Sequence, residues 1–203
     1  MSYRTVLLAL NEISRLDALH AAAKSVASLS GAYIRGLYAI PAAQIYPSTG
    51  FEAVPQMFEG HQTYFRNNLE STRNRFEALL RDTGREGEFL SVEGRSPLIS
   101  DEILNCGRSA DLIIMSATDP SDVSGVELDC VERVLSGAGR PVLVLPRTGT
   151  GEIAPGTVVI GWNGARESAR AVFDSLPLLK AAKSAHVVVV DAEGEPRITQ
   201  ASP

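Results

Sequence analysis

Cysteine and positive charge are both scarce in this chain of 203 residues. Its two cysteines, Cys106 and Cys130, stand far apart and outside any Cys-x-x-Cys arrangement, which argues against a disulfide framework and a thiolate metal motif. Two isolated thiols are typical of the reducing cytoplasm, and we expect that location. The 19 lysines and arginines are outnumbered by 24 aspartates and glutamates, and the net charge of −5 offers no polycationic surface to nucleic acid or anionic lipid.

Long hydrophobic runs are missing as well. The longest, such as the HVVVVDA stretch that begins at His186, are far too short to cross a bilayer. The apolar run after Arg4 ends in Asn-Glu-Ile-Ser without a small-residue cleavage site, which argues against a signal peptide. We therefore expect no membrane contact and no nucleic acid, and we expect small molecules or proteins as partners.

The chain does contain a regular alternation of short apolar runs and longer helical patterns. The apolar runs predict strands over 5–10, 32–40, 88–94, 111–117 and 141–146. Stretches with apolar residues at helical spacing separate them, the longest over about 52–82. Because parallel strands need right-handed crossovers, this order predicts an α/β fold: an open five-stranded parallel sheet with helices on both faces.

Capping residues suggest where three of the helices begin and end. Ser14 is a predicted N-cap of the first helix, and Gly31 is its predicted stop. Ser96 is a predicted N-cap with Pro97 at the first helical position. The last helix of this region is expected to start after Gly125 and to close around 137–139.

A partial repeat follows this first unit. The stretch TVVIGWNGARESARAVFDSLPLL from Thr157 aligns with TVLLALNEISRLDALHAAAKSVASL from Thr5, so that Asn163 falls on Asn11. We divide the chain into a complete unit over 1–146, a Gly/Pro-rich linker over 147–156 and a partial second unit over 157–203. The partial unit reads as a strand, a helix that Pro177 could kink, a second strand and a frayed tail. Such a fragment buries too little apolar surface to stand alone, and three outcomes are open: it packs on the first unit, pairs with another protomer, or is loose.

Three stretches resemble the universal stress protein (UspA) family: TVLLALNE, VEGRSPLISDEILNCGRSADLIIMS and VERVLSGAGRPVLVLP. The resemblance covers nearly the whole chain, and tandem two-unit members exist in that family. It implies the adenine-nucleotide α-hydrolase-like fold and a role in a stress response. Neither the composition nor the spacing of residues indicates that role by itself.

Family members that bind ATP carry a loop of the form G-x-x-G-x(9)-G-[S/T] after the fourth strand, whose glycines let backbone N–H groups approach phosphate oxygens. In this chain Ser116 stands at the first glycine, Thr118 or Asp119 at the second, and Leu128-Asp129 at the final Gly-Ser. The stretch carries four carboxylates, Asp119, Asp122, Glu127 and Asp129, and no Lys or Arg before Arg133. An unpaired like-charge contact at about 4 Å costs on the order of 4 kcal/mol at an effective dielectric of about 20, so the loop is expected to be degenerate.

The family's adenosine contact is an acidic residue after the first strand, and here that position is Asn11. In open α/β sheets ligands sit beyond the carboxyl ends of the strands, at the point where the strand order reverses. The crevice there is expected to be lined by Asn11, Ile40, Ser116, Thr118 and Gly125. One interpretation is a cluster of solvated loops without a cofactor; the alternative is a weak adenine-nucleotide (ATP) site.

No residue pattern points to catalysis. The chain has no G-x-S-x-G nucleophile elbow, and His20, His61 and His186 share no metal-ligand spacing. A slow ATPase is disfavoured because no acid, base or metal-binding Asp cluster accompanies phosphate donors. We expect no enzyme and no metal site.

The last strand of the first unit predicts an interaction between copies of the chain. The run between Pro141 and Pro146 is entirely apolar, and as a terminal strand it leaves backbone groups unpaired unless something covers them. The family resemblance implies a dimer seam at this strand. We expect a homodimer through Val142, Leu143, Val144 and Leu145, and a non-enzymatic protein that acts through dimerisation and protein partners.

Overall fold

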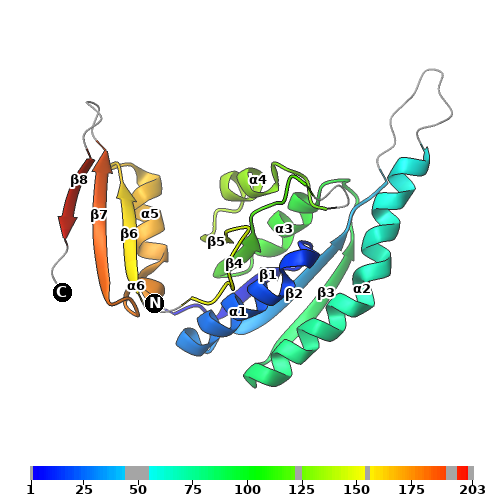
Figure 1. Ribbon diagram of the computed structural model, residues 1–203, viewed down its shortest axis with the longest axis horizontal. Helices are drawn as coiled ribbons and strands as arrows, with labels where there is room; N and C mark the ends of the chain where they lie inside the picture. The colour runs from blue at the N-terminus through cyan, green and yellow to red at the C-terminus, as the bar shows by residue number, and fades with distance from the viewer. Residues whose placement is uncertain (1, 44–54, 122–124, 154–155, 191–195, 201–203) are drawn as a thin grey trace, which may run out of the picture.

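The computed structural model describes residues 2–43, 55–121, 125–153, 156–190 and 196–200. These residues form two sheets: a five-stranded sheet in the order β3-β2-β1-β4-β5 and a three-stranded sheet in the order β6-β7-β8 (Figure 1). The strands of the first sheet are β1 Thr5–Ala9, β2 Tyr33–Ile40, β3 Gly87–Glu93, β4 Leu112–Ser116 and β5 Val142–Leu145. Its helices are the 3₁₀ helix η1 Ile13–Arg15 and the α-helices α1 Leu16–Ser30, α2 Pro55–Thr83, α3 Ile99–Gly107 and α4 Cys130–Gly137.

The first sheet confirms the predicted open parallel architecture, because all four strand pairs run parallel. β1 lies between β2 and β4, so that Val6 is in register with both Ile34 and Leu112. Every residue of β4, and every residue of β1 after Thr5, is buried, as expected for strands covered on both faces. Helix α1 packs beside α2 and α3 beside α4, and the two pairs cover opposite faces (Figure 1).

The residues at the helix ends follow the sequence only in part. Gly31 ends α1 in the left-handed conformation, with φ of 71° and its N–H donated to Ala27, as predicted. Ser14 is not an N-cap, because the chain enters α1 through η1, which contains Ser14. Ser96 does not cap α3 either: its hydroxyl accepts the N–H of Leu98 at 3.1 Å, and the helix begins only at Ile99.

Two further boundaries differ from the prediction for the first unit. Pro97 lies before α3, outside its first turn. Helix α4 begins at Cys130, several residues later than expected, because the backbone over Val126–Asp129 is turn and coil rather than helix.

The second unit consists of β6 Thr157–Trp162, α5 Arg166–Asp174, α6 Leu176–Leu179, β7 Ser184–Val190 and β8 Pro196–Gln200. The predicted helix breaks at Ser175, directly before the turn that contains Pro177. The tail expected to fray includes β8, which pairs antiparallel with β7 over 196–200. Backbone pairing to an open strand edge needs no apolar periodicity in the added strand, which is why the sequence pattern gave no sign of β8.

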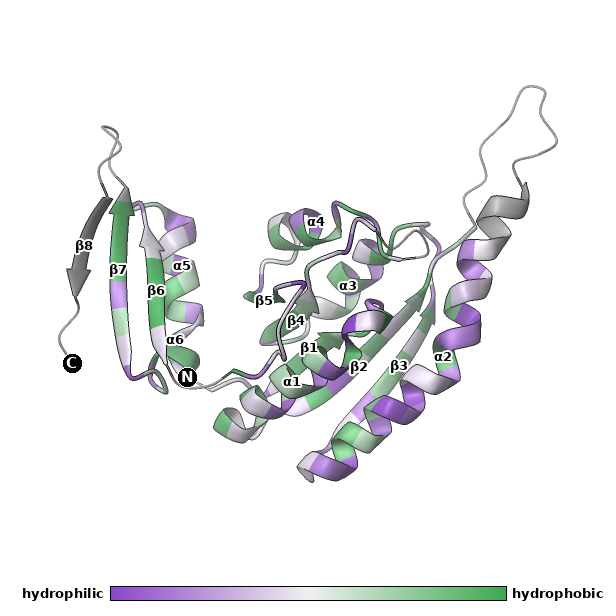
Figure 2. Cartoon of the chain, viewed as in Figure 1, coloured by the Kyte–Doolittle hydropathy of each residue, from purple (hydrophilic) through white to green (hydrophobic). Residues whose placement is uncertain are grey.

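Burial separates the two units sharply. The first unit has a continuous apolar core, whereas none of residues 156–189 of the second unit is buried. Hydrophobic residues nevertheless follow β6 and β7 along most of their length, while much of α2 is hydrophilic (Figure 2). The second unit is therefore a small layer of α5 and α6 against one sheet, without a closed interior of its own among the residues described.

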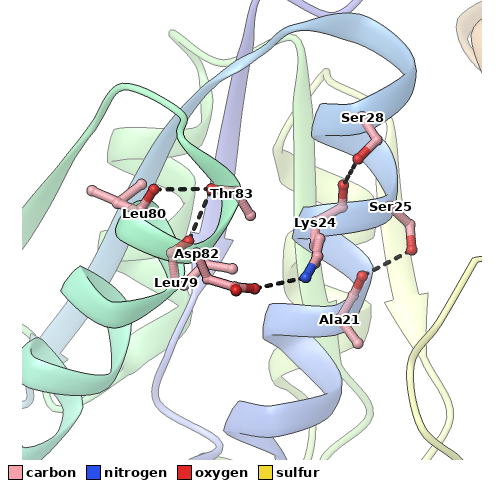
Figure 3. A network of polar contacts seen from close by, with 8 residues as sticks. All are labelled: Ala21, Lys24, Ser25, Ser28, Leu79, Leu80, Asp82 and Thr83. Carbon is pink, nitrogen blue, oxygen red and sulfur yellow. Dashed lines mark hydrogen bonds and ion pairs between the residues drawn. The ribbon is translucent and has the colours of Figure 1, made fainter.

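Polar contacts join α1 to α2 on the outside of the first unit. Lys24 pairs with Asp82, with 2.6 Å between Nζ and Oδ2. Figure 3 shows this contact between the two helices. Arg75 pairs with Asp17 on the same helices. His20 lines the same surface hollow as the four residues of these pairs. Burial and, to a smaller extent, the Arg75 guanidinium lower the pKa of His20 to about 4, against an opposing effect of Asp17.

Acidification is expected to weaken the α1–α2 contact through His20. Its pKa in the folded chain, about 4, lies below the ordinary value of 6.5, so the unfolded chain takes up the proton first. Stability is therefore complete above about pH 6.5 and falls as the pH drops toward about 4, by up to about 2 kcal/mol after allowance for solvent screening. Urea unfolding at about pH 7 and about pH 4.5 measures the loss. The matched control is His20→Gln, which does not titrate; an equal loss in both proteins would contradict this role of His20.

Candidate functional site

The residues predicted to line a crevice meet at the carboxyl edge of the five-stranded sheet. Asn11 follows β1, Ile40 ends β2 and Ser116 ends β4, and these three strands are neighbours. Thr118 and Gly125 belong to the segment between β4 and α4, whose residues 122–124 lie outside the described part of the chain. A ring nitrogen of His61 on α2 lies 3.0 Å from the carbonyl oxygen of Gly125, so α2 also reaches this edge.

Asn11 is engaged by the backbone of the neighbouring strand. Its side chain is 3% exposed, and its Nδ2 donates to the carbonyl of Ala39 at 2.7 Å. Its Oδ1 accepts the N–H of the same residue at 3.0 Å. The amide thus satisfies both backbone groups of Ala39 and links the end of β1 to β2, which is a structural use of this side chain.

The other predicted lining residues also make internal contacts. Ser116 is 2% exposed, and its hydroxyl donates to the carbonyl of Ala117 at 3.3 Å. The hydroxyl of Thr118 lies 3.5 Å from the main-chain oxygen of Glu127. Ile40 is buried, and its carbonyl accepts the N–H of Gly94. The sheet edge is therefore held together largely by its own polar groups.

Two of the loop carboxylates have local partners. Asp119 accepts hydrogen bonds from the hydroxyl and the N–H of Ser121, and these bonds lower the pKa of Asp119. Asp129 pairs with Arg133 one turn along α4, with 2.7 Å between Oδ2 and Nε. The loop that is expected to be degenerate carries two further carboxylates. Of these, Asp122 lies outside the described residues, and Glu127 is described next.

Glu127 makes the contact that the sequence did not predict. Its Oε1 accepts the N–H of Ser100 at 2.7 Å, and its Oε2 accepts the N–H of Ile99 at 3.1 Å. A carboxylate from the β4–α4 segment therefore caps the N-terminus of α3, where backbone N–H groups and the helix dipole favour an anion. The sequence offered one indirect sign of this contact. Leu98 occupies the N-cap position of α3 and has no side-chain acceptor, so the helix has no cap of its own there.

Glu127 also organises the start of α4. Its main-chain oxygen accepts the N–H of Cys130 at 3.0 Å. Burial raises the pKa of the Cys130 thiol, and the nearby Glu127 carboxylate raises it further, so this cysteine stays a protonated core residue. Burial also raises the pKa of Cys106. Within the described ranges no group of three or more His, Cys, Asp or Glu side chains is arranged to hold a metal ion.

β5 ends the first sheet, as the sequence predicted. Val142, Leu143 and Val144 are half-buried, and Leu145 is buried. The N–H groups of Ile113 on β4 and of Ala117, directly after β4, donate to the carbonyls of Pro141 and Leu145. Backbone groups alternate in direction along a strand, so those of Val142 and Val144 point to the outer edge.

Comparison with solved structures assigns the fold. The similarity to a universal stress protein from Archaeoglobus fulgidus DSM 4304 has a TM-score of 0.67 at 15% identity and covers 94% of this chain and 67% of the other. For the universal stress protein UspA from Lactobacillus plantarum the TM-score is 0.52 at 18% identity, with 71% of this chain and 99% of the other covered. A functionally unknown protein from Pseudomonas aeruginosa PAO1 gives 0.52 at 14% identity, over 92% and 60%. No protein-family model and no curated protein matches the chain.

The chain therefore has the fold of the universal stress proteins, as the sequence resemblance predicted. The similarity to the Archaeoglobus protein extends into the second unit, because residues 1–146 make up less than three quarters of this chain. Among the helices of the described ranges, none is long and apolar enough to cross a membrane.

Replacement of Glu127 is expected to destabilise the first unit. Glu127→Ala removes the cap from two N–H groups of α3 and should lower the free energy of unfolding by about 1–2 kcal/mol. Asp129→Ala is the matched control, because it removes a carboxylate two residues away that pairs with the exposed Arg133, and such pairs contribute little. Urea unfolding of the two variants measures the difference. If both variants lost the same stability, the cap would not have the importance assigned to it.

Proposed function

We propose that this protein is a non-enzymatic scaffold of the universal stress type, whose nucleotide loop no longer holds ATP and which acts in a stress response through homodimerisation and protein partners. The observation that carries the proposal is the contact of the Glu127 carboxylate with the N-terminus of α3. This carboxylate comes from the β4–α4 segment, the segment in which relatives that bind ATP carry the glycine loop for phosphates, and it leaves a negative group at this edge of the sheet.

The surrounding residues support the same proposal. Asn11 engages both polar atoms of its amide with Ala39 and is only 3% exposed, which disfavours a contact with an adenosine. The sequence from Ser116 to Glu132 contains no Lys or Arg, so a triphosphate would meet carboxylates without a compensating cation in that stretch. The stress-response role rests on the resemblance to the family and on the shared fold.

A thermal-shift experiment separates this proposal from a weak ATP site. With millimolar ATP and Mg²⁺ the melting temperature should stay within error of the value with Mg²⁺ alone. A ligand of micromolar affinity at about a thousandfold excess would contribute about 4 kcal/mol and raise the melting temperature by several degrees. Such a rise would favour the alternative, an adenine-nucleotide module. A rise that persisted in Asn11→Ala would place the nucleotide elsewhere than the proposed crevice.

The proposed homodimer joins two copies through the outer edge of β5. This edge presents the backbone groups of Val142 and Val144 from an apolar strand that carries no charged side chain. Strands with these properties pair readily with another chain. The family resemblance, which places a dimer seam at this strand, favours a second copy as the partner.

Sedimentation velocity tests the homodimer. The full chain should show a concentration-dependent monomer–dimer equilibrium at micromolar concentration. Val144→Pro removes an outward N–H but no bond to β4 and should leave only monomer, since edge strands tolerate proline. Val144→Thr is the control and should dimerise. A wild-type chain that stays monomeric throughout this range would refute the proposed homodimer.

A further inference from the structure

The segment between the two units lies along α1. Residues 146–153, which we name the strap, leave β5 and follow the helix before β6 begins (Figure 1). Arg15 Nη2 donates to the carbonyls of Pro146 and Gly149, each at 3.0 Å. Near its other end the strap donates the N–H of Ile153 to the hydroxyl of Ser25 at 3.2 Å. The strap is thus attached to Arg15 of η1 near one end and to Ser25 of α1 near the other.

Gly151 fits the strap to the helix. Its φ is 76°, in the left-handed region. A Cβ at this position would lie 2.1 Å from the carbonyl oxygen of Ala18, a backbone atom that cannot move without displacing α1. Gly149 also has a positive φ, of 96°, but a Cβ there would meet nothing within 4 Å. These two glycines therefore share a conformational requirement and differ in their contact with α1.

The second unit is itself attached to the first unit. The hydroxyl of Tyr3, a residue that is 5% exposed, donates to the carbonyl of Asp174 at the end of α5 with a length of 2.7 Å. Burial raises the pKa of Tyr3 to about 12, and the Asp174 charge contributes, so the tyrosine remains a donor at neutral pH. Leu178 of α6 and Ile153 of the strap pack against the core of the first unit.

This attachment places the second unit beside the outer edge of β5. Figure 1 shows β6 and α5 on the β5 side of the five-stranded sheet. A cleft of about 990 Å³ separates them, with Pro141, Val142 and Leu143 on one wall and Arg166, Arg170 and Ala171 on the other. A second sheet joined edge to edge at β5 would continue from that edge with strands spaced about 4.8 Å apart, in the direction that α5 now occupies.

We infer that the strap and the second unit form an autoinhibitory guard over the β5 edge. With the strap docked on α1, the second unit obstructs the approach of another copy, and release of the strap opens the edge for dimerisation. The inference rests on the proposed homodimer through β5. The guard adds a second feature to that homodimer: a contact within each chain lowers the affinity of one copy for another.

The paired glycines give the test. In the full chain, Gly151→Ala forces the strap away from Ala18, whereas Gly149→Ala introduces the same backbone strain without that clash. Trypsin cleavage after the exposed Arg147, followed by mass spectrometry, reports whether the strap is released. Sedimentation velocity should then give a dimer dissociation constant for Gly151→Ala about tenfold lower than for wild type and for Gly149→Ala. Arg15→Ala, which removes two of the hydrogen bonds to the strap, should act in the same direction.

The outcomes separate the inference from the homodimer itself. Faster cleavage with an unchanged dissociation constant would overturn the guard and leave the homodimer standing. Cleavage that is no faster in either Gly151→Ala or Arg15→Ala would also overturn it, because the strap would not be held by these contacts. If even the released variants stayed monomeric, the proposed homodimer would fail and the guard with it. Addition of Val144→Pro to Gly151→Ala should abolish the gain, and a gain that survived would place the seam away from β5.

Discussion

The bond between one carboxylate and two backbone N–H groups determines how the sheet edge of this protein is built. Glu127 reaches from the β4–α4 segment to the start of α3 and at the same time uses its main chain to begin α4. Charge-assisted bonds of this kind are stronger than neutral ones, and here a single residue joins three elements. The same residue also places a carboxylate in the β4–α4 segment, so one side chain contributes both to the packing of this edge and to its negative charge.

Much of the first unit could be predicted because its signals are local. Apolar runs buried on both faces identified the strands, and Gly31 identified a helix end through its own backbone conformation. The contacts at the edge are not local: Glu127 is far from Ile99 in the chain, and the amide of Asn11 meets Ala39 only when β1 and β2 are adjacent. Ser96 had the right residue type for a cap, but a more distant carboxylate took that position. The residues around a helix start do not show whether a distant side chain will cap that helix in place of a local one.

In the second unit the secondary structure was largely predictable, but its contacts were not. Its strands β6 and β7 and its helix break followed the sequence, whose pattern there aligns with the first strand and helix of the chain, whereas β8 was not predicted. The contacts of this unit with the rest of the chain were not predicted from the sequence. None of its residues over 156–189 is buried, and its neighbours are the strap, Tyr3 and α1. A unit without its own closed core depends on such attachments for its position. The cleft beside β5 is a consequence of that dependence.

The two hydrogen bonds of the Asn11 amide restrict which residue type can occupy this position. An aspartate at this position, the residue type of the family's adenosine contact, would turn an oxygen toward the carbonyl of Ala39 in place of the present donor. Two acceptors facing each other in a buried place repel, and the backbone oxygen would lose its partner. A carboxylate at this position would therefore weaken the link between β1 and β2, whatever ligand it could bind.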